Sequence, residues 1–297
     1  MSSTQTAGPA STNASAPPEI SLDRLEAARV IVPLVPKTRL VLIGCGGTGS
    51  WLAPSVARFA RTMAEKFSKE VAVCFVDPDV VEAKNIYRQN FCLAEVGYSK
   101  AVTLAKRYST AWSVNIFACA NKYSWQMVSN LGGYHFDGLT VLIGCVDSRD
   151  ARRDIQNSFH NIGGTVFWLD CGNTKECGQV LLGRNTPGEG ISTFPAKGKC
   201  AWLPLPSRQH KDLVARELPA ERKKKPAVTE GMSCAEIALL DEQGLTINQS
   251  IAAIAADYLK RLLLTEDLDR FQTYIDLASG SMKSTYITPA NLRQWKR

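Results

Sequence analysis

The chain has 297 residues and 45% of them are hydrophobic, which is enough to fill one large domain or two small ones. No apolar run approaches the roughly 18 residues that a membrane span needs, so we expect no span and a cytoplasmic protein. The formal net charge is +7, and residues 185 to 232 hold nine Lys and Arg against five acids. We interpret this excess as solvated surface; an acidic partner is the alternative, and nucleic acid is not expected.

The N-terminal 20 residues are rich in Ser, Thr, Ala and Pro, which predicts a disordered tail and not a signal peptide. Residues 21–297 are expected to form a single domain. Its nucleotide-binding half covers 35–172, and its antiparallel half covers 173–297. The second half includes an irregular basic crossover loop at about 185–232. Nine scattered cysteines without a C-x-x-C pair indicate reduced thiols.

Apolar runs at 39–44, 71–77, 114–120, 139–147 and 165–172 alternate with helical patterns at 49–67, 99–111 and 148–160. Runs that are apolar throughout and joined by helices predict a parallel sheet covered on both faces. A strand at 177–184, a helix beginning near 244 and a hairpin at 270–288 follow. The expected fold is therefore a doubly wound, Rossmann-like α/β domain whose mostly parallel sheet continues into antiparallel strands.

A glycine-rich turn, GCGGTGS, joins the first strand to the first helix and contains Gly44, Gly46, Gly47 and Gly49. Glycines let the backbone approach a phosphate, and the N–H groups at a helix start favour negative charge. Asp77, at the end of the second strand, is placed to bind ribose hydroxyls. The motif predicts a nucleotide but does not separate NAD from ATP, and a tight turn without a ligand is the alternative.

The next segment, NIYRQNF, favours ATP. It contains Asn85, Arg88 and Gln89, and Lys100 follows at the start of a helix. An enzyme that attacks ATP at the α-phosphorus must stabilise charge on the α-phosphate and on the leaving pyrophosphate, which Arg and Lys can do. An enzyme that only holds NAD has no such need.

A carboxylate follows the fourth apolar run, in VLIGCVDSRDARR. Asp147 is expected at the carboxyl edge of the sheet, where it can bind Mg²⁺ that bridges to ATP phosphates or simply cap the next helix. Arg152, one turn further, is expected to serve the phosphates or to lie on the helix surface.

Together, GCGGTGS, VDPDVVEAKNIYRQ, GYSK and GCVDSRDARR resemble the ThiF/MoeB and ubiquitin-activating adenylation family over about residues 35–290. Within it the chain looks most like the ThiF-family proteins of the PRTRC system. The resemblance implies Mg-ATP-dependent adenylation of the C-terminal carboxylate of a small ubiquitin-like, β-grasp protein, by a homodimer.

Residue by residue, the resemblance implies that the four glycines line the nucleotide, Asp77 holds the ribose and Asp147 binds Mg²⁺. It also implies that the phosphates are handled by four side chains: Asn85, Arg88, Gln89 and Lys100. No general base is needed, because the attacking carboxylate is already ionised. An arginine acting across a dimer stays open, with Arg24 and Arg29 as the candidates.

The chain also departs from the family. It lacks the two C-x-x-C pairs of zinc-binding members, so we expect no zinc site, although four cysteines can still converge in space: Cys171, Cys177, Cys200 and Cys234. Ser148 replaces the Asn that often follows the metal-binding Asp. Cys234 lies where thioester-forming relatives place their cysteine, which predicts a nucleophile; an ordinary small apolar residue is the alternative, and Cys200 is a second choice.

Two other functions remain open. One is an NAD-dependent Rossmann oxidoreductase, which needs a proton-transferring His, Lys or Tyr in a substrate domain; we see no such constellation in the sequence. The other is a catalytically silent ThiF-like binding module that docks a partner without turning over ATP.

Overall fold

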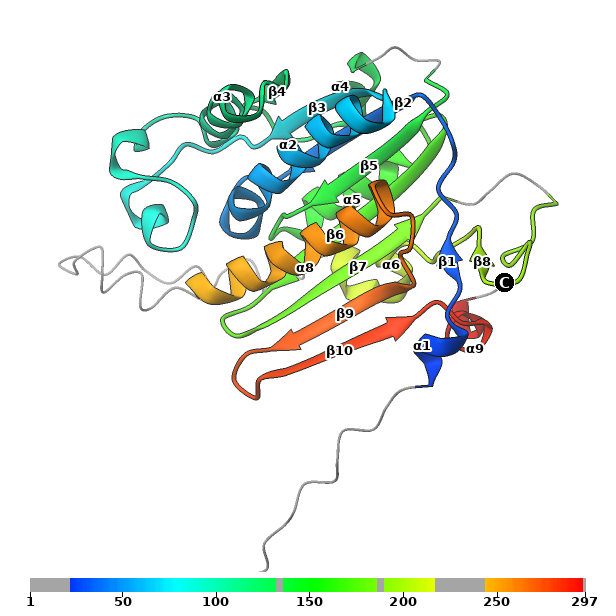
Figure 1. Ribbon diagram of the computed structural model, residues 1–297. Coiled ribbons are helices and arrows are strands. Elements are labelled where there is room, and N and C mark those ends of the chain that lie inside the picture. The colour runs from blue at the N-terminus through cyan, green and yellow to red at the C-terminus, as the bar shows by residue number, and fades with distance from the viewer. Residues whose placement is uncertain (1–21, 132–135, 186–189, 217–243, 296–297) are drawn as a thin grey trace, which may run out of the picture.

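An eight-stranded sheet forms the centre of this computed structural model, which describes residues 22–131, 136–185, 190–216 and 244–295 (Figure 1). The strand order is β10-β9-β7-β6-β5-β2-β3-β4. Five strands run parallel: β2 (Lys37–Ile43), β3 (Glu70–Val76), β4 (Ile116–Cys119), β5 (Leu139–Gly144) and β6 (Thr165–Asn173). Three continue the sheet antiparallel: β7 (Cys177–Arg184), β9 (Arg270–Asp276) and β10 (Ser281–Tyr286). The predicted union of a parallel and an antiparallel half is confirmed.

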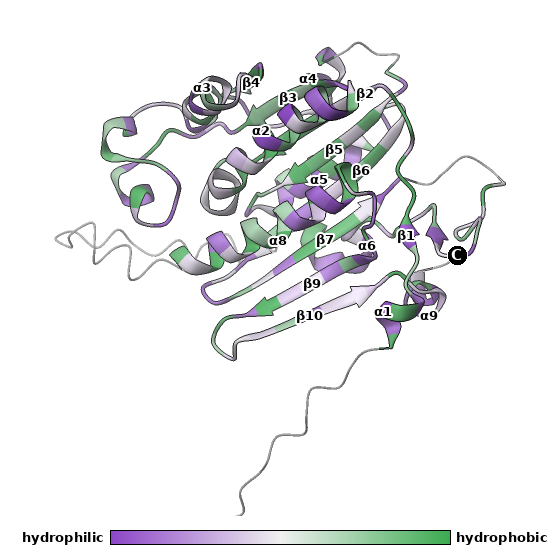
Figure 2. Cartoon of the chain, in the orientation of Figure 1, coloured by the Kyte–Doolittle hydropathy of each residue, from purple (hydrophilic) through white to green (hydrophobic). Residues whose placement is uncertain are grey.

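Helices cover both faces of the sheet. On one face lie α2 (Gly47–Phe67), α3 (Lys100–Trp112) and α8 (Leu245–Leu263), and on the other lie α4 (Trp125–Asn130) and α5 (Arg149–Ser158). Because β2 and β5 are sandwiched between these layers, they are buried over almost their whole length. Figure 2 shows the corresponding hydrophobic colouring along the central strands. The doubly wound α/β prediction is confirmed.

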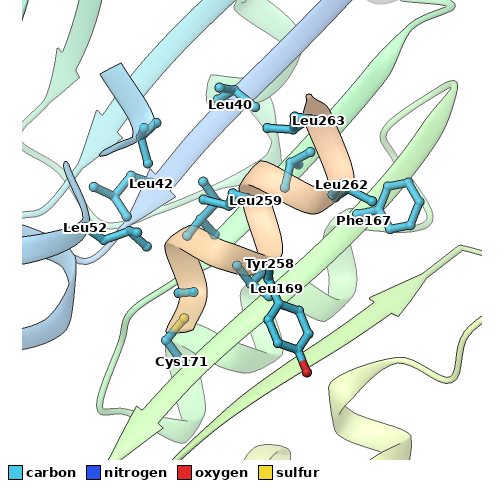
Figure 3. Close-up of a cluster of buried hydrophobic side chains, with 14 of the residues drawn as sticks. Leu40, Leu42, Leu52, Phe167, Leu169, Cys171, Tyr258, Leu259, Leu262 and Leu263 are labelled. Carbon is cyan, nitrogen blue, oxygen red and sulfur yellow. The ribbon is translucent and has the colours of Figure 1, made fainter. Parts of the chain in front are cut away.

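The larger core lies between α8 and the sheet (Figure 3). Leu40 and Leu42 alternate along β2 on the face that meets the helix, and Leu169 does the same from β6. Leu259 and Leu262 of α8 fill the space above them, and each of these side chains is at most 1% exposed. This packing fixes the start of α8 close to the start of α2.

The order of the strands creates a crevice at the carboxyl edge. From β2 the chain continues to β3 on one side, and later to β5 on the other. The connections that leave β2 and β5 therefore diverge to opposite faces of the sheet, which opens a ligand crevice in doubly wound folds. The glycine turn lies at this point, between β2 and α2.

The remaining elements are short. β1 (Arg29–Val30) and β8 (Lys199–Cys200) form a separate parallel pair, accompanied by α1 (Asp23–Glu26) and α9 (Pro289–Leu292). Four 3-10 helices also occur in the part of the chain that the structure describes: η1 (Ala83–Tyr87), η2 (Leu93–Glu95), η3 (Lys211–Val214) and η5 (Arg293–Trp295).

The crossover segment differs from its prediction. We expected an irregular loop, but its described part, 190–216, contains β8, α6 (Pro206–Gln209) and η3. Gln209 accounts for part of this order, because its Nε2 donates to the carbonyls of Leu182 and Pro204 at 2.8 and 2.7 Å. The rest of the predicted loop lies outside the described residues. Within the described ranges, no helix has the length and apolar character required to cross a membrane.

Candidate active site

A cavity of about 1200 Å³ opens at the carboxyl edge of the sheet. Its wall comes from the glycine turn, the end of β3, η1 and the segment after it, and the starts of α3 and α5. Nine of the predicted site residues line it: Gly44, Gly46, Gly47, Asp77, Asn85, Arg88, Gln89, Lys100 and Asp147. Residues that are up to about 100 positions apart in the sequence therefore meet in one space.

The glycine turn is shaped by close backbone contacts. Gly44 has a φ of +88°, and a Cβ there would lie 2.4 Å from the carbonyl oxygen of Cys145. Gly46 is the N-cap of α2 and has no side chain that could cap the helix, and Gly46, Gly47 and Thr48 at this helix start line the cavity. Gly49 differs from its prediction: it does not line the cavity but packs under the Gly44 carbonyl, where a Cβ would lie 1.9 Å away.

Asp77 directly follows β3 and is 5% exposed. Its Oδ2 accepts the N–H of Cys45 at 2.6 Å, and its Oδ1 accepts the N–H of Asp79 at 2.8 Å. Burial raises the pKa of this carboxyl group, while these two N–H groups and Lys100 oppose the rise. The Asp77 side chain therefore holds the glycine turn through the N–H of Cys45 and also lines the cavity.

The segment that contains Arg88 is attached to the first turn of α2. Trp51 Nε1 donates to the Arg88 carbonyl at 3.1 Å, and Ser50 Oγ accepts the N–H of Asn90 at 2.9 Å. Neighbouring Gln89 is 4% exposed, and its Oε1 has no hydrogen-bond partner among the described residues. Since buried amide oxygens are normally hydrogen-bonded, a water molecule or a ligand in the cavity is expected to donate to this atom.

Asn85 has a mainly structural role. Its Oδ1 accepts the N–H of Glu82 at 2.9 Å and so closes the first turn of η1. It is 3% exposed but still lines the cavity.

Lys100 is the first residue of α3, behind the N-cap Ser99. Only 7% of its side chain is exposed, and its Nζ lies 3.1 Å from Oδ2 of Asp79, whose side chain is 64% exposed. A desolvated ammonium whose carboxylate partner is largely solvated retains capacity to bind another anion.

Asp147 lies three residues beyond the end of β5 and is exposed to the cavity. The next residue, Ser148, caps α5 by accepting the N–H of Ala151 at 3.2 Å. Because the helix already has this cap, the Asp147 carboxylate is not needed for capping. No group of three or more His, Cys, Asp or Glu side chains suited to a metal occurs in the described ranges.

Arg152 does not lie on the helix surface, which was one of its two predicted alternatives, but points inward to Asp170. It also lines the cavity, so its action on phosphates stays a prediction. Its Nε lies 2.9 Å from Asp170 Oδ1 and 3.3 Å from Oδ2, and the two residues are 6% and 0% exposed. Burial raises the pKa of Asp170, and Arg152 opposes that rise. The pair forms part of the cavity wall.

Cys200, the second-choice nucleophile, does not line this cavity. Cys200 is fully buried and its thiol donates to the Trp202 carbonyl at 3.0 Å, so the second-choice prediction for this residue is wrong. Cys234 lies outside the described residues, so its role as a nucleophile stays a prediction. Arg24 is one of the two arginines considered for action across a dimer. Its Nε lies 3.9 Å from Oδ2 of Asp269.

A second cavity of about 500 Å³ adjoins the first. It lies over the start of β7 and the β9–β10 hairpin, and Cys177 and Tyr274 line it. Arg152, Gly172 and Asn173 belong to the walls of both cavities. The two spaces are therefore neighbours that share one wall.

The sequence analysis missed three polar residues that contact one another near this shared wall: Thr48, Asn173 and Asn248. Of these, Asn173 lines both cavities and Thr48 lines the larger one. One signal was present, because Asn248 occupies an apolar position in the helical pattern of Ile247 and Ile251. Trp51 was also missed, since a tryptophan in an amphipathic helix normally indicates packing.

The fold and the cavity define a Rossmann-like domain with a polar ligand site at the topological switch point of its sheet. The sequence matches the ThiF family over residues 35–286, and the chain belongs to that family. No curated protein matches the sequence.

Several solved structures share the fold. PaaA is 17% identical, with a TM-score of 0.52; the match covers 84% of this chain and 64% of PaaA. E. coli MccB with succinimide is 15% identical, with a TM-score of 0.51 and coverage of 89% and 65%. E. coli MccB with MccA-N7isoASN is 13% identical, with a TM-score of 0.50 and coverage of 89% and 66%. The chain thus spans slightly less than two thirds of the length of these proteins.

Proposed function

We propose that this chain uses Mg-ATP to adenylate the C-terminal carboxylate of a small ubiquitin-like protein. The observation that carries the proposal is the convergence of Arg88, Lys100 and Asp147 on the glycine turn within one cavity. Two cations and one carboxylate beside an uncapped helix start suit a metal-bound triphosphate better than a dinucleotide.

The reaction joins two substrates at the α-phosphorus. A carboxylate oxygen of the protein substrate attacks this atom, the bond to the bridging oxygen breaks, and pyrophosphate leaves with the electron pair. The products are an acyl adenylate and pyrophosphate. Because the nucleophile is already ionised, catalysis consists of placing the two substrates and stabilising the charge that moves to the leaving group.

Most of the predicted residues have a task in this proposal. Arg88 and Lys100 stabilise the negative charge on the α-phosphate and pyrophosphate. The ion pair with Asp79 positions the Lys100 ammonium for this task. Asp147 supplies an oxygen ligand for Mg²⁺, whose bound charge neutralises the phosphates. The glycine turn offers N–H groups, and the buried Gln89 Oε1 accepts a hydrogen bond from the ligand.

The smaller cavity is the proposed site of the carboxyl-terminal tail. It adjoins the nucleotide cavity through Gly172, where a Cβ would lie 3.2 Å from Arg152 Nη2. The structure of MccB with MccA-N7isoASN supports the binding of a second molecule to a protein of this fold. A tail that enters here ends beside the nucleotide.

Finer points follow from the family resemblance. We propose that the chain is a PRTRC-type member, that it acts in the cytoplasm as a homodimer, and that Cys234 accepts the acyl group as a thioester with release of AMP. A nonreducing gel tests the last point: a thiol-sensitive conjugate should form in the wild type and be absent in Cys234→Ser. Light scattering of the purified chain tests the dimer.

ATP–pyrophosphate exchange tests the main proposal. The assay uses ubiquitin-like proteins with a free C-terminus, beginning with any encoded beside this gene, and the same proteins with an amidated C-terminus as the control. We expect Mg²⁺-dependent exchange with the free carboxylate only. Tight NADH binding without exchange would favour the oxidoreductase, and ATP and partner binding without exchange would favour the silent binding module.

A further inference from the structure

Three polar side chains meet where α2, β6 and α8 come together, and we call them the Thr48–Asn173–Asn248 cluster. Thr48 Oγ1 lies 3.2 Å from Asn173 Oδ1 and 3.3 Å from Asn248 Oδ1, so its hydroxyl hydrogen is shared between two acceptors. Asn173 Nδ2 donates to Asn248 Oδ1 at 3.1 Å. Asn248 is 0% exposed and Thr48 is 4% exposed. Asn173 is half-buried, so the cluster is a polar contact between three elements whose inner side, at Thr48 and Asn248, is buried.

The Asn248 carboxamide has one possible orientation. Its second polar atom lies 3.0 Å from the Gly244 carbonyl, which can only accept, so this atom must be Nδ2. Oδ1 is then directed at Thr48 and Asn173. All the polar atoms of the side chain have partners, and burying it in this position carries little penalty.

The Asn248 carboxamide also packs directly against the glycine turn. A Cβ placed on Gly47 would lie 2.3 Å from Asn248 Oδ1 and 2.8 Å from its Cγ. The absence of a side chain at position 47 is thus required by Asn248 and not only by a ligand. Any movement of the first turn of α2 must displace this carboxamide.

On its other side the cluster reaches the smaller cavity. Asn173 lines both cavities, and it is paired in the sheet with Gly178, the residue next to Cys177. Ile251, one turn along α8 from Asn248, packs on Gly178, where a Cβ would lie 2.6 Å from its Cδ1. The turn that closes one cavity and the strand that lines the other are therefore held by the same face of α8.

We infer that Asn248 is a positioning residue that fixes the glycine turn against Asn173. Through this contact, nucleotide binding in the larger cavity is coupled to the conformation of the smaller cavity. This inference rests on the proposed function, because it assumes that the larger cavity binds Mg-ATP. Energetic coupling of this kind requires a physical connection that ligand binding shifts between two arrangements, and the cluster supplies the connection.

The first test compares two variants of α8. Asn248→Ala removes the cluster contacts, whereas Tyr258→Phe removes a different buried polar contact of α8, a 2.8 Å hydrogen bond to Thr273 nearly three turns away. Both should lower the stability of the fold. Only Asn248→Ala should weaken Mg-ATP binding measured by calorimetry, by about tenfold, because two to three hydrogen bonds are lost at the turn. Equal affinities in the two variants would overturn the inference.

The second test uses a substitution and its suppressor. Gly47→Ala should weaken Mg-ATP binding because the new methyl group collides with Asn248, and adding Asn248→Ala should restore part of that loss by removing the three nearest atoms. Additive losses in the double variant would contradict the direct contact on which the inference depends.

The third test reads the smaller cavity directly. Cys177 is exposed there and does not line the larger cavity, so its alkylation by iodoacetamide reports on the smaller one. At saturating Mg-ATP, the rate should change at least about threefold in the wild type and in Tyr258→Phe, and stay unchanged in Asn248→Ala. An unchanged rate in wild-type protein that binds Mg-ATP, or the same change in Asn248→Ala, would overturn the inference. Wild-type protein that binds no Mg-ATP would instead defeat the proposed function.

Discussion

Arg152 and Asp170 form a buried ion pair behind the wall that the two cavities share, with Arg152 Nε 2.9 Å from Asp170 Oδ1. The pair joins α5 to β6, two elements that are adjacent in sequence but belong to different layers. A buried charge whose partner is removed is left uncompensated in a medium that solvates it poorly.

Asp170→Ala should therefore lower the free energy of unfolding by about 3 kcal/mol or more, measured by urea denaturation. Asp150→Ala is the matched control, because it breaks the ion pair of Arg153 on the exposed side of the same helix. That change should cost less than about 1 kcal/mol. Similar losses in the two variants would show that Arg152 and Asp170 do not form the buried contact described above.

Asp147→Asn should reduce Mg²⁺-dependent ATP–pyrophosphate exchange by about a hundredfold or more, since an amide is a poor ligand for Mg²⁺ and leaves the phosphates less neutralised. The fold should tolerate the change because the residue is exposed and Ser148 caps α5. Asp137→Asn, an exposed carboxylate before the opposite end of β5, should leave exchange unaltered. Full activity in Asp147→Asn would remove this residue from the metal site.

Arg88→Ala should lower kcat/KM for adenylation by about a hundredfold or more, and Arg88→Lys should recover only part of it, because the ammonium lacks the planar fork of the guanidinium. Arg58→Ala controls for the loss of a surface arginine. Arg58 belongs to α2, the helix that begins at the glycine turn, but it lies on an exposed face of that helix. Its guanidinium carbon lies 4.7 Å from the centre of the Trp112 ring. Equal effects of the alanine variants at positions 88 and 58 would mean that Arg88 does not act on the phosphates.

The thiols should separate into two classes. Burial raises the pKa of Cys74 to about 12 and also raises the pKa of Cys45 well above its usual range. Desolvation and the Asp276 carboxylate raise the pKa of the exposed Cys177. Because the thiolate is the reactive form, native protein at pH 8 should be alkylated first at Cys92, more slowly at Cys177, and at Cys45 and Cys74 only after unfolding.

Mass spectrometry of peptides measures this order. Labelling of Cys45 in native protein as fast as that of Cys92 would contradict the described packing. The same experiment gives the background that is needed to judge the reactivity of Cys234.

The fold was largely predictable because its signals are local. Continuous apolar runs flanked by turns identified the central strands, and the glycine turn followed by a helical pattern identified the first crossover. The carboxyl-edge position of Asp77 and Lys100 followed from the parallel connectivity alone. The site as a set of residues was therefore available from the order of its motifs.

What the sequence did not reveal depends on contacts between distant segments. Arg152 of α5 points inward to Asp170, 18 residues away on β6, and Asn248 packs against Gly47, about 200 residues away. Gly49 fits a nucleotide motif, yet its position is required by the carbonyl of Gly44. Motif spacing gives the residue types but not which neighbour each side chain meets.

The products formed from ATP test the central claim most directly. With the ubiquitin-like partner, Mg²⁺ and ATP labelled at the α-phosphate, the label should appear in AMP and in an acyl adenylate on the partner. Hydroxylamine should cleave this acyl adenylate and release the label as AMP. The amount of pyrophosphate should equal the amount of AMP and acyl adenylate together. Formation of ADP and phosphate, or of no product while NADH binds tightly, would contradict attack at the α-phosphorus.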